Sequence, residues 1–136
     1  MLTNTFNSLT INNNDYNLIN QINILYYYGD RWPQIHHARM RIGCSKLNND
    51  LTNKLHVIDN ASCACGHPIE DANHFFLECP LHHDLREELL DEINGLCEPT
   101  IENLIHGSLL LPMMENRLIF DAVHSFITNT TRFDFD

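Results

Sequence analysis

The chain has 136 residues, 43% of them hydrophobic, and a formal net charge of −10 at pH 7. This length favours one small domain with a modest core. No apolar run reaches the roughly 18 residues that span a bilayer, and the start of the chain lacks the basic-then-apolar order of a signal peptide. With five cysteines, an odd number, we expect an intracellular protein, cytoplasmic or nuclear, whose thiols are reduced and which does not contact membranes.

Residues 1–17 are rich in Asn and Thr and show no lasting period, so we expect a loose N-terminal segment. Apolar residues spaced by three and four predict a helix over about 15–28 that ends at Gly29. The run Tyr26–Tyr28 alternatively fits a short strand. A second helix is predicted over about 33–42, because Pro33 suits a first helical turn and a glycine follows.

The second part of the chain continues the helical pattern. Leucines at spacings of four predict a short helix within 44–62, and the same signal predicts another over 81–94. Between them, acids in the first turn and a closing proline predict a short helix over 70–78. A short apolar segment at 100–106 precedes the clearest helix, whose apolar stripe is expected to be core or partner surface: Met114, Leu118, Ile119, Ala122, Val123, Phe126 and Ile127.

Charge is unevenly distributed along this pattern. Residues 1–62 carry five basic and four acidic side chains, a net +1, whereas residues 63–136 carry three basic and fourteen acidic ones, a net −11. The acidic half repels phosphate, so any nucleic-acid contact is expected in the first half. The candidate nucleic-acid-binding residues are Arg31, Arg39, Arg41, Lys46 and Lys54.

The most informative window spans 17 residues and contains Cys63, Cys65, His74 and Cys79. Three thiolates and one imidazole are ligands that Zn²⁺ takes at about 2.0–2.3 Å, and four of them saturate a tetrahedral ion. Since no position is left for a substrate, the pattern predicts a structural zinc rather than a catalytic one. The Cys-x-Cys spacing is tighter than usual, and Gly66 suits a turn that needs a positive φ.

His74 is preferred as the nitrogen ligand because Phe75–Leu77 beside it offer apolar shielding. Other histidines remain rival donors at this stage, namely His67, His82 and His83. The alternative to a metal site is a set of reduced, buried cysteines that behave as small hydrophobes. The cysteines outside the window are expected to be unpaired packing thiols, namely Cys44 and Cys97.

Two stretches resemble the zinc-binding tail that follows the polymerase domain in non-long-terminal-repeat (LINE-like) retrotransposon reverse transcriptases. The family pattern is R-x-G-x-x-x-L-N, then C-x-C-G, then E-x-x-x-H-x-x-x-x-C-P, and the likeness covers roughly residues 24–130. Its lead-in is matched by Arg41, Gly43, Leu47 and Asn48, and its metal ligands by Cys63, Cys65, His74 and Cys79. The resemblance implies a module that helps the enzyme hold its own RNA or the target DNA.

The chain contains no sequence typical of a polymerase, an endonuclease or a ribonuclease H. We therefore expect a truncated or domesticated remnant with weak RNA or DNA binding, in which Trp32 and Tyr26–Tyr28 either stack on bases or belong to the core. The alternative is a structural module that docks through its C-terminal helix on other reverse-transcriptase domains or proteins. Catalysis is not expected, because zinc-enzyme spacings and a recognisable nucleophile are absent from the sequence.

These expectations combine into one fold class: a mainly α, small multi-helix domain stapled by one structural zinc site. A single domain is expected over residues 18–136. It would consist of a basic helical front at 18–62, a zinc segment at 63–83 and an acidic helical tail at 84–136.

Overall fold

The computed structural model describes residues 23–134, and within this range the chain forms helices and no strand. The expected mainly α fold is therefore confirmed. The expected loose segment 1–17 and most of the helix expected at 15–28 lie outside the described residues. In chain order the elements are α3 (Arg31–Arg41), α4 (Asn48–Asn53), the π-helix η1 (His74–Glu78), the 3₁₀ turn η2 (Pro80–His82), α5 (His83–Ile93), α6 (Ile101–His106) and α7 (Met113–Asn129).

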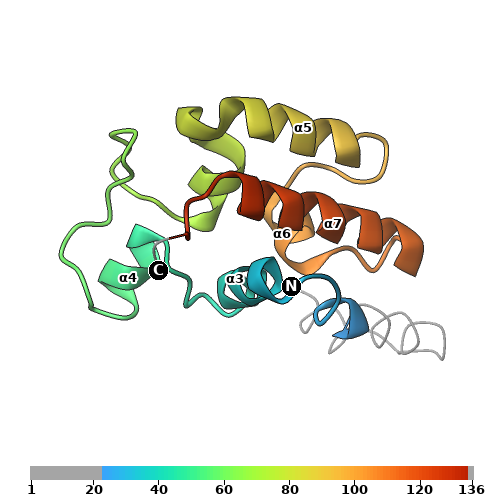
Figure 1. The fold of residues 1–136 in the computed structure, drawn as a ribbon, viewed down its shortest axis with the longest axis horizontal. Coiled ribbons are helices and arrows are strands. Elements are labelled where there is room, and N and C mark those ends of the chain that lie inside the picture. Colours follow the sequence, from blue (N-terminus) through green and yellow to red (C-terminus); the bar gives the residue numbers. More distant parts are fainter. Residues whose placement is uncertain (1–22, 135–136) are drawn as a thin grey trace.

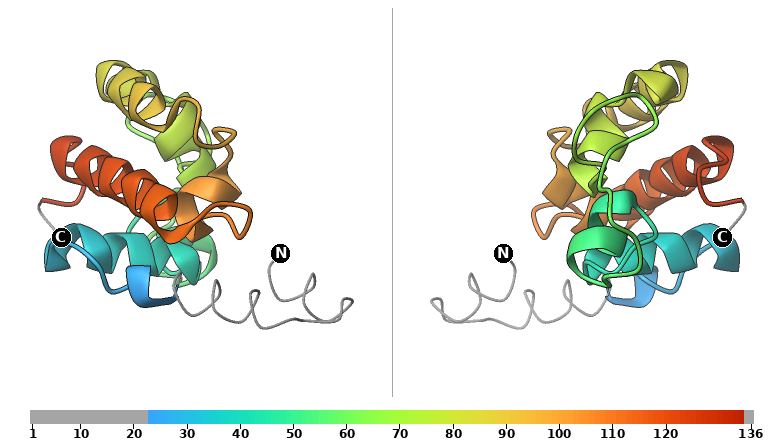
Figure 2. Two further views of the ribbon diagram at one scale, coloured as in Figure 1. Left: turned by 90° about the vertical axis from the view of Figure 1, so that its right-hand side faces the viewer. Right: turned by 90° about the vertical axis from the view of Figure 1, so that its left-hand side faces the viewer.

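Helix α7 is the centre of the fold, with α5 packed on one side of it and α3 on the other (Figures 1 and 2). The short helix α6 contacts both α3 and α7. Helix α4 and the long loop that follows it lie together at one end of this stack (Figure 1). Because α7 packs on both sides, it needs a broad apolar surface, and its sequence supplies one.

The stripe predicted for the last helix is mostly used inside the protein. Buried side chains from it include Ile119, Ala122, Val123, Phe126 and Ile127. Met114 and Leu118 instead remain 66% and 51% exposed. The core that forms around the buried members also contains Leu25, Met40, Leu47, Phe75, Phe76, Leu89, Ile93, Leu104, Ile105, Phe120 and Phe133.

Two predicted elements differ from the structure. The helix expected within 44–62 covers only Asn48–Asn53, because His56 adopts a positive φ of 53° soon after it. Of its expected stripe, Leu47 is buried whereas Leu55 is 43% exposed. Tyr26 and Tyr27 form a turn after a helical segment at 23–25, so the strand alternative is wrong for them.

No helix formed by residues 23–134 is both long enough and apolar enough to cross a membrane.

A buried histidine pair joins α3 to α7. His37 is fully buried, and its Nδ1 lies 3.0 Å from Nε2 of His124 while its Nε2 lies 2.9 Å from the Leu104 carbonyl oxygen. Burial lowers the pKa of His37 well below 6.5, and the nearby Arg41 and His124 lower it further. Both rings therefore sit in the interior as neutral hydrogen-bonding groups.

This burial predicts an acid-sensitive fold. The pKa of His37 in the folded protein is below its value of 6.5 in the unfolded chain, so the unfolded chain binds the proton at a higher pH than the folded protein does. The free energy of unfolding is therefore highest above pH 6.5 and decreases as the pH falls below it. We expect His37→Gln to reduce the slope of the free energy of unfolding against pH by up to about 1.4 kcal/mol per pH unit. Urea unfolding of both proteins at several pH values measures it, and any effect of acid on the cysteine window is common to both. Identical pH slopes would contradict the assignment.

Candidate metal centre

The structure brings Cys63, Cys65, His74 and Cys79 together. Their donor atoms all lie within 4.8 Å of one another. The Sγ atoms of Cys63 and Cys79 are 3.7 Å apart, and Sγ of Cys65 lies 3.3 Å from Nε2 of His74. Cys63, His74 and Cys79 are buried and Cys65 is half-buried. This cluster of three thiols and one imidazole could hold a metal ion.

A tight turn places the first two cysteines. The Cys63 amide donates to the His67 carbonyl oxygen at 2.8 Å, and the Gly66 amide donates back to the Cys63 carbonyl oxygen at 2.9 Å. Gly66 has a φ of +100°, in the left-handed region that side-chain-bearing residues avoid. The turn therefore explains how Cys-x-Cys-Gly brings two thiols to one side of the loop.

A π-helix places the other two ligands. Residues 72–73 begin a helical turn that continues as η1, and the Cys79 amide donates to the His74 carbonyl oxygen at 2.8 Å, the i to i+5 bond of a π-helix. The Asp71 side chain accepts from the His74 amide at 2.8 Å and so caps the turn. The sequence predicted His74 within a helix and Cys79 at its exit, and both positions are as expected.

Arg86 of α5 holds the end of η1 in place. Its Nε donates to the Phe76 carbonyl oxygen at 3.0 Å, and its Nη2 donates to the Cys79 carbonyl oxygen. These are carbonyl groups that the end of a helical turn leaves without partners. Sequence reasoning missed Arg86, because nothing in its local pattern distinguishes it from a solvent-exposed arginine of an amphipathic helix.

The surroundings shift the pKa values of the Cys63 and Cys65 thiols in opposite directions. Burial raises the pKa of the Cys63 thiol to about 12. The His67 amide donates to Sγ of Cys65 at 3.4 Å, and this hydrogen bond is the main reason that the pKa of Cys65 is lowered. Burial thus disfavours the thiolate of Cys63, whereas the hydrogen bond from the His67 amide favours that of Cys65.

The rival histidines are not part of this four-residue cluster. His67 stacks on the His74 ring with centroids 4.2 Å apart, and its Nδ1 pairs with the Ile69 carbonyl oxygen. His82 lies against the Phe75 ring, 5.3 Å between centroids. His67, His74 and Glu78 form a second group whose donor atoms also approach within 4.8 Å. His74 belongs to both groups, and its Nδ1 lies 3.5 Å from Glu78 Oε1.

A buried carboxylate, Glu70, links the loop to the rest of the domain. It forms an ion pair with Arg132, with Nη2 to Oε1 at 2.7 Å and Nε to Oε2 at 2.9 Å. Its Oε1 also accepts from the Asn48 amide at 2.9 Å, and the Asn48 side chain donates to the Ser62 carbonyl oxygen at 2.7 Å. Burial would raise the pKa of Glu70, but the hydrogen bonds from Arg132 and Asn48 hold it below its ordinary value. Glu70 Oε2 is 3.8 Å from Cys63 Sγ.

No local pattern indicated the ion-pair partner of Glu70, because Arg132 is 62 residues away along the chain. Glu70 and Asn48 both occur in the two stretches on which the resemblance to the retrotransposon tail rests, but the sequence did not show that they contact each other. Glu70 and Asn48 close the loop that carries Cys63.

The basic residues proposed for nucleic acid are placed unequally. Arg41 is committed to the interior, since its Nη1 donates to the Ile105 carbonyl oxygen at 3.0 Å and its Cζ lies 4.0 Å from the Tyr26 ring centroid. Burial lowers its pKa to about 10. Lys54 pairs with Asp50 at 3.7 Å.

The other basic candidates lie along one side of α3. Arg39 and Lys46 line a groove of about 230 Å³ together with Trp32, which is 38% exposed. Arg31 is exposed at the start of α3. The aromatic residues, expected either to stack on bases or to belong to the core, lie in different places. Tyr26 packs on Phe120, whereas Trp32 lines the groove.

Cysteines outside the cluster also differ from one another. Cys97 packs against the core, as expected for a small hydrophobe, and burial raises its pKa. Cys44 is exposed, so the expectation that it is a packing residue is wrong. The reason is its position after Gly43, where the chain leaves α3 at a φ of +74°.

We expect Arg132→Met to destabilise the domain by about 2–4 kcal/mol, because it leaves the Glu70 carboxylate buried without its cation. This is less than the cost of breaking a fully buried pair, since the Arg132 side chain is 23% exposed and that of Glu70 only 4%. Chemical denaturation measures the loss. Arg31→Met, an exposed arginine, is the control and should change stability by less than about 0.5 kcal/mol. Equal effects of both substitutions would show that Glu70 does not depend on Arg132.

Comparison of the chain with protein-family models, with curated proteins and with solved structures finds no match. The likeness to the retrotransposon tail therefore stays a prediction. The geometry itself shows a mainly helical domain whose Cys63, Cys65, His74 and Cys79 could hold a metal ion.

Proposed function

We propose that Cys63, Cys65, His74 and Cys79 hold one structural Zn²⁺, and that the domain is a zinc-stapled nucleic-acid-binding module similar to the tail of retrotransposon reverse transcriptases. It binds RNA or DNA weakly and performs no catalysis of its own. The observation that carries the proposal is the convergence of three thiols and one imidazole within 4.8 Å of one another.

The spacing of the donor atoms supports zinc. A tetrahedral ion with bonds of about 2.3 Å to sulfur and about 2.0 Å to nitrogen separates two sulfurs by about 3.8 Å and a sulfur from a nitrogen by about 3.6 Å. The observed separations are 3.7 Å for Cys63 and Cys79 and 3.3 Å for Cys65 and His74. These two separations are therefore within a few tenths of an ångström of the tetrahedral values.

The surroundings support a structural role. Four protein ligands leave no position for a substrate, and bound Zn²⁺ would cross-link the turn at Cys63 to the exit of η1. Glu78 Oε1, 3.5 Å from Nδ1 of His74, is placed to orient the imidazole from its far side. The His67 amide, which donates to Cys65 Sγ, would stabilise the thiolate.

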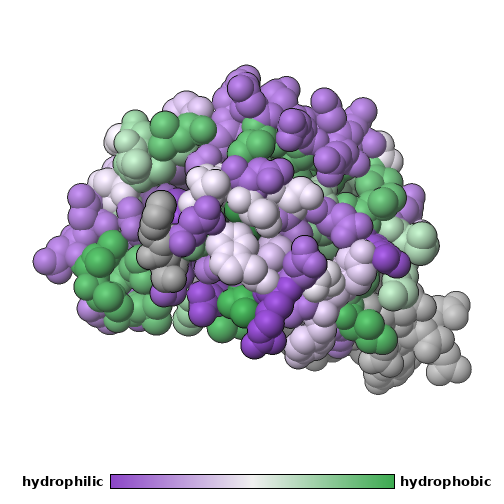
Figure 3. All heavy atoms as spheres, viewed as in Figure 1, coloured by the Kyte–Doolittle hydropathy of each residue, from purple (hydrophilic) through white to green (hydrophobic). Residues whose placement is uncertain are grey.

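The distribution of charge supports nucleic-acid binding at α3. Helix α3 contains no acidic residue, and Arg31 and Arg39 remain on its surface beside the inward-facing Arg41. Helix α5 instead carries the acids Asp84, Glu87, Glu88, Asp91 and Glu92. Hydrophilic side chains gather over α5 at the top of Figure 3. Because α7 lies between the two helices, the acidic surface is held on the other side of the fold from the basic one. The net charge of the chain is therefore a poor guide to the potential at α3.

The groove beside α3 offers the two contacts that single-stranded nucleic acid uses. Arg39 and Lys46 are available for phosphates, and Trp32 offers an edge of its indole for stacking. Asp134 also lines the groove and would weaken phosphate binding there. With two flanking cations the binding is expected to be weak and sensitive to salt.

The alternative function is docking on a protein through α7. It is favoured by one observation, the exposure of Met114 and Leu118 on the same helix. The rest of the predicted stripe is buried in the core, so the surface left for a partner is small.

Removal of one ligand tests the metal. We expect wild-type protein, purified without an affinity metal, to contain one zinc per chain, and Cys65→Ser to lose it together with the cooperative unfolding of the domain. Metal-binding energy is also folding energy in such sites, on the order of 10 kcal/mol at pH 7 for small zinc domains. Plasma mass spectrometry and thermal unfolding give the two readouts.

The matched control is Cys44→Ser, which removes an exposed thiol outside the cluster. It should keep both the zinc and the melting temperature of the wild type. A Cys65→Ser protein with unchanged zinc content and stability, or a wild type without zinc, would sink the metal assignment.

The nucleic-acid proposal is tested by salt. We expect Arg39→Gln/Lys46→Gln to weaken binding to a single-stranded oligoribonucleotide and to reduce the slope of log K against log salt by about 1.4, since each lost phosphate contact contributes about 0.7. Fluorescence anisotropy between about 50 and 200 mM salt measures both quantities. The control is Arg117→Gln, which removes an exposed arginine from α7. An affinity that does not change with salt concentration, or an equal loss of affinity in Arg117→Gln, would count against α3 as the interface.

A further inference from the structure

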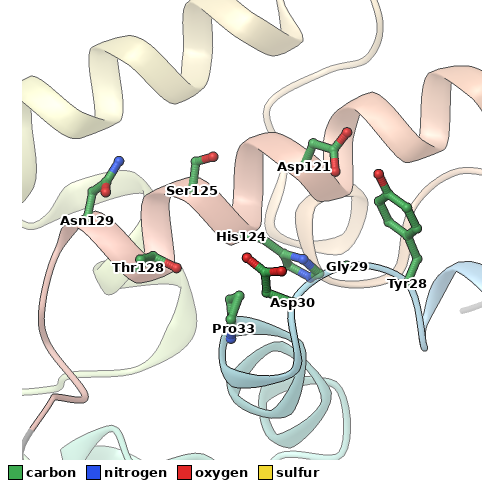
Figure 4. Close-up of a pocket in the computed structure, with 9 residues that line it drawn as sticks. All are labelled: Tyr28, Gly29, Asp30, Pro33, Asp121, His124, Ser125, Thr128 and Asn129. Atoms are coloured by element: carbon green, nitrogen blue, oxygen red, sulfur yellow. The ribbon is translucent and has the colours of Figure 1, made fainter.

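A cavity of about 410 Å³ lies between α7 and the segment that leads into α3. Five of its lining residues lie on α7 and the other four lie at or before the start of α3 (Figure 4): Asp121, His124, Ser125, Thr128 and Asn129, and Tyr28, Gly29, Asp30 and Pro33. Its volume is within the range of about 300–1,000 Å³ that is usual for small-molecule sites. The metal cluster and the groove beside α3 use none of these nine residues.

His124 presents a hydrogen-bond acceptor to this cavity. The Leu104 carbonyl can only accept, so Nε2 of His37 carries the hydrogen and Nδ1 of the neutral ring accepts. Nε2 of His124, 3.0 Å away, must then donate to His37, which leaves Nδ1 of His124 as a lone pair. His124 is only 8% exposed, and its Nδ1 has no hydrogen-bond partner among residues 23–134. The Leu104 carbonyl and the His37 ring together thus leave Nδ1 of His124 as a hydrogen-bond acceptor at the cavity.

Gly29 keeps that atom accessible. A Cβ built on Gly29 would lie 3.0 Å from Nδ1 of His124, which is tighter than ordinary contact. The backbone there has a φ of +89°, which also favours glycine.

Two carboxylates lie beside the histidine without cationic partners. Asp30 occupies the N-cap position of α3, yet its side chain makes no capping hydrogen bond, and within the described chain neither Asp30 nor Asp121 takes part in an ion pair. Burial and the nearby Arg41 lower the pKa of His124, and the two carboxylates oppose this shift. The nine lining residues include no Arg or Lys, although Arg117 Cζ lies 4.4 Å from the ring centroid of Tyr28. The nearby α3 N-terminus contributes about half a positive charge, which is less than the two negative charges it faces.

The spacing of these groups argues against a single metal ion. Among residues 23–134, two groups of acidic, histidine or cysteine side chains have donor atoms within 4.8 Å of one another, and neither includes Asp30, Asp121 or His124. The acceptors are therefore too dispersed for one cation of atomic size. A flexible molecule that carries several N–H donors can reach them one by one.

We propose that this cavity binds an aliphatic polyamine, with one ammonium group at Asp30 and the His124 Nδ1 atom and another at Asp121. Ammonium groups are donors only, and the cavity offers carboxylates, an imidazole lone pair, two hydroxyls and an amide oxygen. The site is separate from the proposed zinc and the α3 groove.

Spermidine is the probe, titrated into the full chain and followed by the amide signals of ¹⁵N-labelled protein. We expect saturable shifts centred on the residues of the cavity. Asp121→Asn should weaken the affinity at least about fivefold, because it removes one charge-assisted contact to an ammonium group. Asp121 is exposed, so the substitution is not expected to disturb the fold.

The matched control is Asp91→Asn, the same change at an exposed aspartate of α5 outside the cavity. It should leave the affinity within about twofold of the wild type, as expected for a distant, screened charge. Mg²⁺ at equal ionic strength should not reproduce the shifts. The proposal is overturned by the absence of saturable shifts, by equal weakening in both variants, or by equal shifts with Mg²⁺, since the last two results would show diffuse attraction of cations to an acidic protein.

Discussion

The Glu70 carboxylate is the contact on which the arrangement of the domain depends. It joins the start of α4, through the Asn48 amide, to the loop of Cys63 and to Arg132 beyond the end of α7. A buried carboxylate is costly unless its oxygens are satisfied, and here the cation and the amide satisfy them. The polar network thereby specifies how a loop with few apolar contacts sits against a helical core.

The position of the Cys/His cluster depends both on the spacing of its residues in the sequence and on the backbone conformation of η1. A spacing of five between His74 and Cys79 suits the i to i+5 hydrogen bond of η1, and Arg86 occupies the carbonyls at its end. Sequence reasoning expected an ordinary short helix there, because apolar periodicity does not distinguish a π-turn from an α-turn. It still placed His74 within the helical turn and Cys79 at its exit, since the proline at position 80 marks the end of the turn in either case.

The charge asymmetry of the sequence becomes a spatial one in the fold. Helix α7 separates the acidic α5 from α3, whose sequence contains three arginines and no acidic residue, so the net charge of −10 is not spread evenly over the fold. Counting charges along the sequence found the two halves but did not show that the guanidinium of the half-buried Arg41 lies over the Tyr26 ring. Arginine at a helix surface has the same local signature whether it faces water or a neighbouring ring.

The sequence by itself determined the helical class, the window that contains the four clustered Cys and His side chains, and the glycine-marked helix ends, because each depends on residues near one another in the chain. Tertiary structure alone decided what depends on distant partners. It paired Glu70 with Arg132, aligned His37 with His124, and buried most of the α7 stripe while leaving Met114 exposed. The physical reason is that burial and hydrogen-bond pairing are properties of the packed chain, and a local pattern gives the face of a helix but not what covers it.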